Sequence, residues 1–282
     1  MAVALTEPTT RTRRLTTTLV GLMTVQAVLG LMFPAQYRDV EWIRATWYGN
    51  DWVTLAVAVP LLLIGRANAK AGSPRGLVLW LGVTAYAAYN YAFSLFGAAL
   101  NVFFPLYVAS VVLAVVMLII ALPRVDAGEV TRRLAPRVPA EVLGGYFVFV
   151  GIGLSAVWLS MWVGYVFFGR PTPVEPEVFQ LVAALDLSVM VPLLVSGGTL
   201  MWRRHSWGPV VCSIGGLQAS LYLLVLSVNA ILAIRRGLAV SPGELPVWGT
   251  LFVFTTAATA TAILSISASR GIATTRERSS SR

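Results

Sequence analysis

The residue best placed to do chemistry is Asp186, because it lies well inside an uncharged apolar segment, 178–202. It is about eight residues from the start of that segment, or ~12 Å along a helix. In hydrocarbon, a carboxylate costs at least about 2.5 kcal/mol unless it is protonated, paired or hydrated. We therefore expect Asp186 to face polar groups or a wet cavity, where it could accept a proton or hold a cation.

Two other apolar segments offer polar partners for this carboxyl group. In segment 76–97 the polar side chains share one face of a helix, and in segment 207–234 two polar side chains lie one helical turn apart. The candidate ligand-binding side chains are Tyr86, Tyr89, Asn90, Gln218 and Tyr222. Because buried hydroxyl and amide groups need hydrogen-bond partners, we expect a polar cluster around Asp186 in the outer half of the membrane. This cluster either holds helices together or lines a binding cavity.

An internal repeat relates the two halves of the chain at an offset of 132 residues. LAVAVPLLLIG at 55–65 and LSVMVPLLVSG at 187–197 share seven of eleven residues, including a proline and a glycine. The pattern predicts two four-span units with the same orientation, as in parallel-repeat transporters. It also predicts paired kinks at Pro60 and Pro192. Asp51, one turn from the position equivalent to Asp186, is a further candidate ligand-binding residue.

The elements that carry these residues are typical of an all-α, polytopic transmembrane helix bundle. Of 282 residues, 57% are hydrophobic and 12% are charged, and the mean hydropathy is +0.77. About eight segments could cross roughly 30 Å of hydrocarbon. They are 15–35, 51–66, 76–97, 103–123, 143–169, 178–202, 207–234 and 246–268. The stretch QYRDVEWIRATWYGND, 36–51, between the first two is expected to form a short helix on the outer interface.

The distribution of positive charge predicts the domain organisation and the orientation. Sixteen of the 21 Lys and Arg residues fall on one side of these spans, which places both termini in the cytoplasm. Arginine dominates over the single lysine, which suggests a high-GC bacterial genome and a bacterial inner membrane. The predicted parts are a cytoplasmic tail (1–14), two four-span units (15–123 and 143–268), a cytoplasmic linker (124–142) and a disordered cytoplasmic tail (269–282).

Several classes of function are excluded by what the chain lacks. One cysteine, Cys212, and one histidine, His205, cannot form a disulfide, a bis-histidine haem site or a zinc site. We expect no cofactor, no metal and no catalytic residue, so an enzyme is disfavoured. The net charge of +9 flanks hydrophobic segments, which argues for membrane lipid and against nucleic acid as a partner. The oligomeric state is not encoded in any pattern.

Three stretches resemble an uncharacterised family of bacterial multi-span integral membrane proteins: YGNDWVTLAVAVPLLL, YNYAFSLFGAALNVFFPLYVA and ALDLSVMVPLL. The resemblance implies a membrane location and no particular activity. Two functions therefore remain open. One is a small-molecule or ion permease with a polar cavity around Asp186. The other is a non-catalytic accessory or scaffolding subunit that binds other membrane proteins or lipid. An open cavity at Asp186 would favour the permease, and a packed carboxyl group would favour the subunit.

Overall fold

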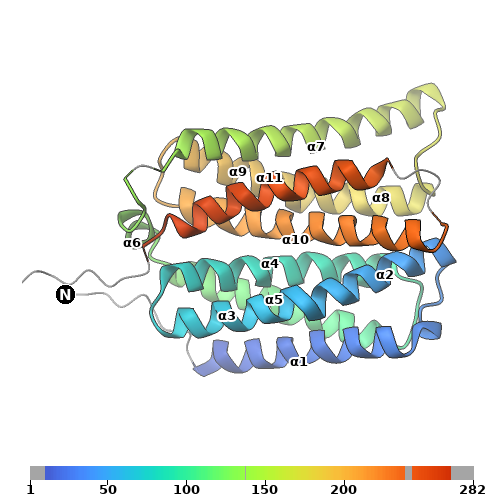
Figure 1. Cartoon of the computed structure of the whole chain (residues 1–282), viewed down its shortest axis with the longest axis horizontal. Coiled ribbons are helices and arrows are strands. Elements are labelled where there is room, and N and C mark those ends of the chain that lie inside the picture. The colour runs from blue at the N-terminus through green and yellow to red at the C-terminus, as the bar shows by residue number, and fades with distance from the viewer. Residues whose placement is uncertain (1–9, 137, 239–242, 268–282) are drawn as a thin grey trace, which may run out of the picture.

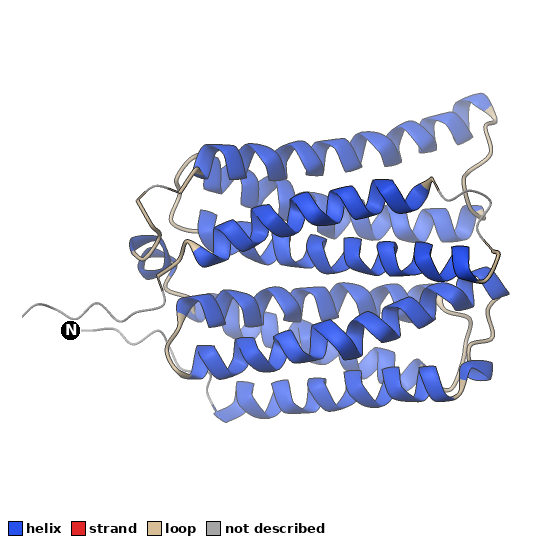
Figure 2. Cartoon of the chain, in the orientation of Figure 1, coloured by secondary structure: helices blue, strands red, loops and turns tan. Residues whose placement is uncertain are grey.

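The computed structural model describes residues 10–136, 138–238 and 243–267, and the elements in these ranges are helices without a strand (Figures 1 and 2). Seven helices among them are long and apolar enough to cross a membrane. They are Arg11–Met32, Glu41–Lys70, Phe104–Arg124, Ala140–Phe168, Pro176–Trp202, Gly208–Arg235 and Glu244–Leu264. The predicted all-helical class is confirmed for the described residues, and the seven apolar helices are compatible with the predicted multi-pass membrane protein.

The first half of the chain forms five longer helices with short 3-10 and π turns between some of them. In chain order they are α1 (Thr10–Met32), η1 (Pro34–Gln36), α2 (Glu41–Val53), η2 (Thr54–Ala58), α3 (Val59–Lys70), α4 (Pro74–Gly97), α5 (Phe104–Ala121) and η3 (Leu122–Arg124). The six-residue helix α6 (Ala127–Arg132) then lies in the predicted linker. Its first turn is capped by Asp126, whose side chain accepts from the Glu129 backbone N–H.

The second half follows a closely similar order. Its elements are α7 (Ala140–Phe168), α8 (Pro176–Leu185), η4 (Asp186–Met190), α9 (Val191–Trp202), α10 (Gly208–Arg235) and α11 (Glu244–Leu264). Figure 1 shows the helices running side by side, with α1 and α7 on opposite sides of the bundle and α4 and α10 in the middle. The predicted disordered tail, 269–282, lies outside the described residues.

Helix α4 is long enough to span a bilayer but is not among the seven apolar helices. Its tyrosines and its asparagine lower its mean hydropathy. Most of its side chains are nevertheless buried, because α3, α5 and α10 pack around it. Protein rather than lipid therefore surrounds the polar stripe of 76–97, which removes most of the cost of its polar groups.

Two boundaries differ from the sequence-based expectation. The prediction of a separate interfacial helix within 36–51 is wrong, because Glu41–Lys70 is one continuous helical run of α2, η2 and α3. Trp47, expected at the interface, is 2% exposed and donates its indole N–H to Asp39. Asp51 accordingly lies ten residues into the helix rather than at its mouth. Helix α1 also begins at Thr10, within the stretch predicted as a tail.

The predicted kinks at Pro60 and Pro192 take the form of π turns just before each proline. In η2 the Val59 N–H bonds the Thr54 carbonyl, and in η4 the Val191 N–H bonds the Asp186 carbonyl. Each bond spans five residues instead of four, so one extra residue is inserted into each helix. Both turns lie at the same offset of 132.

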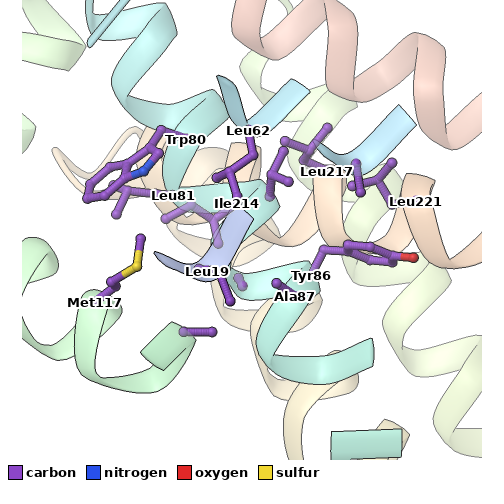
Figure 3. Close-up of a cluster of buried hydrophobic side chains, with 14 of the residues drawn as sticks. Leu19, Leu62, Trp80, Leu81, Tyr86, Ala87, Met117, Ile214, Leu217 and Leu221 are labelled. Carbon is purple, nitrogen blue, oxygen red and sulfur yellow. The ribbon is translucent and has the colours of Figure 1, made fainter. Parts of the chain in front are cut away.

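The core joins both halves around α4. Figure 3 shows Leu19 of α1, Leu62 of α3 and Met117 of α5 gathered with Leu217 and other side chains of α10 around the helix that carries Trp80 and Tyr86. At the end of the bundle where α1 begins, Arg75 of α4 donates to the Leu264 carbonyl at 2.5 Å and to the Ile266 carbonyl. The described ends of the chain therefore lie at the same end of the bundle.

Candidate functional site

Asp186 lies where helix α8 gives way to the π turn η4, about ten residues or ~15 Å along the helix from Pro176. Asp186 is only 1% exposed. The π turn follows directly from local sequence: Pro192 cannot donate a backbone hydrogen bond, and the helix adjusts one turn earlier. The carboxyl group is thus fixed in the interior of the bundle.

Two side chains from different helices donate hydrogen bonds to this carboxyl group. The Tyr89 hydroxyl of α4 donates to Oδ1 at 2.5 Å, and the Trp158 indole N–H of α7 donates to Oδ2 at 2.9 Å. Tyr222 of α10 packs edge-on against the Tyr89 ring, with 5.3 Å between ring centroids. Asp186 therefore joins α4 of the first half to α7 and α10 of the second.

The remaining candidates from the stripe are buried but do not donate to Asp186. Asn90 is 7% exposed, and its backbone carbonyl accepts from Ser94. The Tyr86 hydroxyl and the Gln218 Nε2 atom are buried without a hydrogen-bond partner among the described residues. Tyr86 and Gln218 are related by the offset of 132, so an unpartnered polar atom occurs at this position in both halves.

Asp51 is the centre of a second buried cluster. Its Oδ2 atom accepts from the Tyr37 hydroxyl at 2.6 Å, and its Oδ1 atom accepts from Gln26 Nε2 at 3.1 Å. Gln26 Nε2 also donates to the Tyr37 oxygen at 3.0 Å, and the Tyr91 hydroxyl donates to Gln26 Oε1 at 3.1 Å. Gly30 leaves room for this network, because a Cβ atom there would collide with both Asp51 and the Tyr37 hydroxyl.

The two clusters are built alike. Each carboxyl group accepts one hydrogen bond from a tyrosine hydroxyl and one from an N–H group on the first helix of its own half. These N–H donors are Gln26 and Trp158, again 132 residues apart. The sequence therefore provides each half with a donor at the same repeat position and an acid within one turn of the same repeat position.

Among the described residues, no basic side chain forms an ion pair with either carboxyl group. The ion pairs found within 4 Å in the described part of the chain involve Asp126, Glu129 and Glu141. These residues lie in or near α6 and at the start of α7, far along the chain from both buried carboxyl groups. Hydrogen bonds from Arg132 and Arg133 hold the pKa of Glu129 below its usual range. Asp51 and Asp186 depend instead on neutral donors.

A cavity of about 220 Å³ lies away from Asp186, at the end of α4 that leads into α5. Its walls are Ser94, Leu95, Ala98, Ala99, Leu100, Asn101, Phe104 and Tyr107. Of the polar cluster predicted around Asp186, Tyr89 bonds the carboxyl group and Tyr222 packs against Tyr89, but Asp186 does not line this cavity.

Four residues of these clusters, Gln26 among them, were not predicted as site residues. Trp158 looks in the sequence like any aromatic residue of an apolar segment. Tyr37 comes from a loop, so its depth cannot be counted along a helix. Tyr91 faces away from the stripe that contains Tyr89. The repeat offset from Gln26 to Trp158 is the sequence signal that could have identified Trp158.

The chemistry available to these clusters is the transfer or storage of a proton and the binding of small polar groups. Among the described residues, no group of three or more His, Cys, Asp or Glu side chains is arranged to hold a metal ion. No protein-family model, curated protein or solved structure matches the chain. The geometry is therefore the only basis for a functional proposal.

Proposed function

We propose that this protein is a small-molecule or ion permease, built from two parallel four-span units and residing in a bacterial inner membrane. Eight spans result when α4 is counted with the seven apolar helices. This count is supported by the length of α4, 24 residues or ~36 Å, and by its burial among α3, α5 and α10.

The two-unit arrangement is supported by matched features at one offset. The π turns η2 and η4 precede Pro60 and Pro192, and both are followed by equivalent glycines that let the next helix approach closely. Helix α2 contacts α10, α4 contacts α8, and α4 contacts α10. A two-fold axis along the bundle would exchange the first two contacts and leave the third unchanged, as in transporters with parallel repeats.

Asp186 carries the permease proposal. It is an ionisable residue at a π turn within a continuous helix, it lies between the two units, and its donors come from both of them. Ionisable groups inside membrane proteins mark substrate or proton pathways, and π turns occur frequently at functional sites. A proton or cation that binds there would weaken the bonds from Tyr89 and Trp158 and so alter the packing between the units.

The orientation with both termini in the cytoplasm is supported by the cations of the described residues. The end of the bundle where α1 begins carries Arg11, Arg13, Arg14, Arg66, Lys70, Arg75, Arg124, Arg132, Arg133, Arg203 and Arg204, and the opposite end carries Arg38, Arg44, Arg170, Arg235 and Arg236. Cytoplasmic segments of membrane proteins are enriched in such residues. Membrane lipid is the expected surrounding partner.

The second candidate is a non-catalytic accessory or scaffolding subunit, and the packing of Asp186 favours it. The residue is 1% exposed, both carboxylate oxygens are hydrogen-bonded, and the cavity lies elsewhere. In this function the carboxyl group would only hold helices together, with each bond contributing about 0.6 kcal/mol. The permease, by contrast, requires a second state in which Asp186 becomes accessible.

The test is thermal stability of the purified protein against pH and against a panel of cations and metabolites. For a permease, wild type should be stabilised by at least one panel member, as binding to the folded state requires. Asp186→Asn should stay folded and lose that effect, because an amide hydrogen-bonds but neither titrates nor carries charge. Glu177→Gln is the matched control, since it removes an exposed carboxyl group from the same helix, α8. Identical profiles for wild type and Asp186→Asn would contradict the permease and support the subunit.

A further inference from the structure

The cavity near the α4–α5 connection is separated from the Asp51 cluster by one tyrosine. Tyr107 of α5 forms part of the cavity wall, yet the residue is only 2% exposed. Its hydroxyl has no hydrogen-bond partner among the described residues, although the side chains of Tyr37 and Asn101 lie next to it. A buried hydroxyl without a partner costs about 1–3 kcal/mol, so its retention calls for an explanation.

The other polar groups of the cavity are already used. Ser94 donates to the Asn90 carbonyl, and Asn101 donates to the Ala99 carbonyl while it accepts from the Phe103 N–H. Tyr107 is thus the wall residue with an unused polar group, and its neighbour Tyr37 already donates to Asp51.

The direction of the bonds around Asp51 determines what Tyr37 can do. Tyr91 donates to Gln26 Oε1, which leaves Gln26 Nε2 to donate both to Asp51 and to the Tyr37 oxygen. The Tyr37 proton then goes to Asp51 Oδ2. This arrangement suits an ionised Asp51. A protonated Asp51 would donate its own proton to Tyr37, whose hydroxyl must then turn to another acceptor. Tyr107 is the adjacent hydroxyl with free acceptor capacity.

We propose that Tyr107 and Tyr37 form a route by which protons pass between water in the cavity and the carboxyl group of Asp51. In one direction, the O–H bond of Asp51 breaks and its proton goes to the Tyr37 oxygen. The Tyr37 proton goes to the Tyr107 oxygen, and the Tyr107 proton goes to a water molecule in the cavity. Each tyrosine gains one proton and loses one, so it ends neutral, and one proton has left Asp51.

The titratable neighbours of Asp51 are Tyr37, Tyr86, Tyr91 and Tyr107, from the α1–α2 connection, α4 and α5. Of these, Tyr107 is the one that also lines the cavity. Gln26 of α1 is neutral, and α10 approaches α2 through the neutral Asn229 at Gly49. Asp39, near Tyr107, is already engaged, because its carboxylate accepts from the Trp47 indole and from the Ala99 N–H.

This inference deepens the proposed function by giving Asp51 an access route, and it rests on that function only for its biological purpose. It is tested by infrared spectroscopy of the protein in bilayer vesicles during exchange from H₂O to D₂O. The carbonyl stretch of a protonated carboxyl group shifts on deuteration, and Asp51→Asn and Asp186→Asn assign the two bands. The rate at which the Asp51 band shifts measures proton exchange at that residue.

Tyr107→Phe should slow exchange at Asp51 by about tenfold or more, because positioned proton-transfer groups contribute typically 10²–10⁴-fold. It removes only an unpartnered hydroxyl, so the fold should be kept. Ser110→Ala is the matched control, because it removes another buried, unpartnered hydroxyl one turn further along α5 and should leave the rate unchanged. Ala99→Leu, which narrows the cavity, should slow exchange at Asp51 as well.

The Asp186 band is an internal reference and should exchange equally fast in wild type and Tyr107→Phe. An unchanged Asp51 rate in Tyr107→Phe would overturn the route, as would slowing of both bands together. A protein with no protonated Asp51 band at any pH at which it stays folded would also overturn it. Failure of the permease would appear separately, as identical ligand profiles for wild type and Asp186→Asn, with the Asp51 exchange unaffected.

Discussion

Two close helix contacts at equivalent positions predict a matched pair of destabilising substitutions, Gly65→Ala and Gly197→Ala. A Cβ atom at Gly65 of α3 would lie 2.7 Å from the Trp80 nitrogen on α4, and one at Gly197 of α9 would lie 2.9 Å from the Cys212 nitrogen on α10. Both obstacles are backbone atoms, so no side-chain rotation can relieve them. Ordinary contact begins near 3.4 Å, so each helix pair must separate by about 0.5–0.7 Å.

The expected cost combines two opposing effects. Overpacking of this kind costs about 1–3 kcal/mol. Replacing glycine by alanine within a helix returns up to about 1 kcal/mol of helix propensity. We therefore expect each variant to lose about 1–2 kcal/mol of unfolding free energy, with similar values at both positions because they are equivalent in the repeat.

The assay is reversible unfolding in mixed micelles, followed by tryptophan fluorescence while the fraction of denaturing detergent is raised. Gly145→Ala on α7 is the control, because a Cβ atom there meets nothing within 4 Å. It should be neutral or slightly stabilising. If Gly197→Ala behaves like this control while Gly65→Ala does not, the close approach of α9 to α10 is wrong, and so is the equivalence of the two units.

Three further predictions address the clusters and the orientation. Trp158→Phe keeps an aromatic ring against Phe179 but removes the N–H donor to Asp186. The variant should lose about 0.6–1.7 kcal/mol of unfolding free energy in the same assay. An unchanged unfolding free energy would show that this hydrogen bond does not stabilise the protein. The pKa of Glu129 is lowered from 4.5, so the ionised side chain should stabilise the fold fully above pH 4.5 and less as the pH falls below that value. Glu129→Gln should remove this pH dependence of the unfolding free energy. The size of the dependence should be below about 1 kcal/mol, because solvent screens the ion pairs with Arg132 and Arg133. A periplasm-active reporter should work when fused after Pro173 and fail after Arg282; activity at both places would contradict the even number of spans.

The sequence was sufficient for the parts of the fold that depend on hydrophobic length and on proline. The apolar runs predicted most helices within a few residues, and Pro60 and Pro192 identified where the helices are interrupted. The run from Glu41 to Lys70 was misjudged because charges and Gly49 near its start are typical of a loop. In the structure, Gly49 lies against Asn229 of α10, in a space that a Cβ atom would fill.

The candidate site was predictable where helix depth could be counted. Asp186 and Tyr89 were expected at similar depth, and the hydrogen bond between them confirms that expectation. Depth alone does not say which way a side chain faces, so Asn90, adjacent to Tyr89, was grouped with it although it makes no bond to Asp186. Tyr37 was beyond such counting because it belongs to the connection between α1 and α2, whose path depends on tertiary packing.

The paired π turns also bear on the order of events in the history of the chain. A π turn results from one extra residue in a helix and is destabilising on its own, so it seldom arises twice at the same place. On the proposed duplication, η2 and η4 are copies of one insertion, and that insertion entered the ancestral four-helix unit before it was doubled. The ancestor would then have been a single four-span chain with an interrupted second helix, and two such chains side by side would have formed a symmetric dimer. Threonine at the start of η2 and aspartate at the start of η4 would be the later divergence, by which only one unit kept or gained its acid at the turn itself.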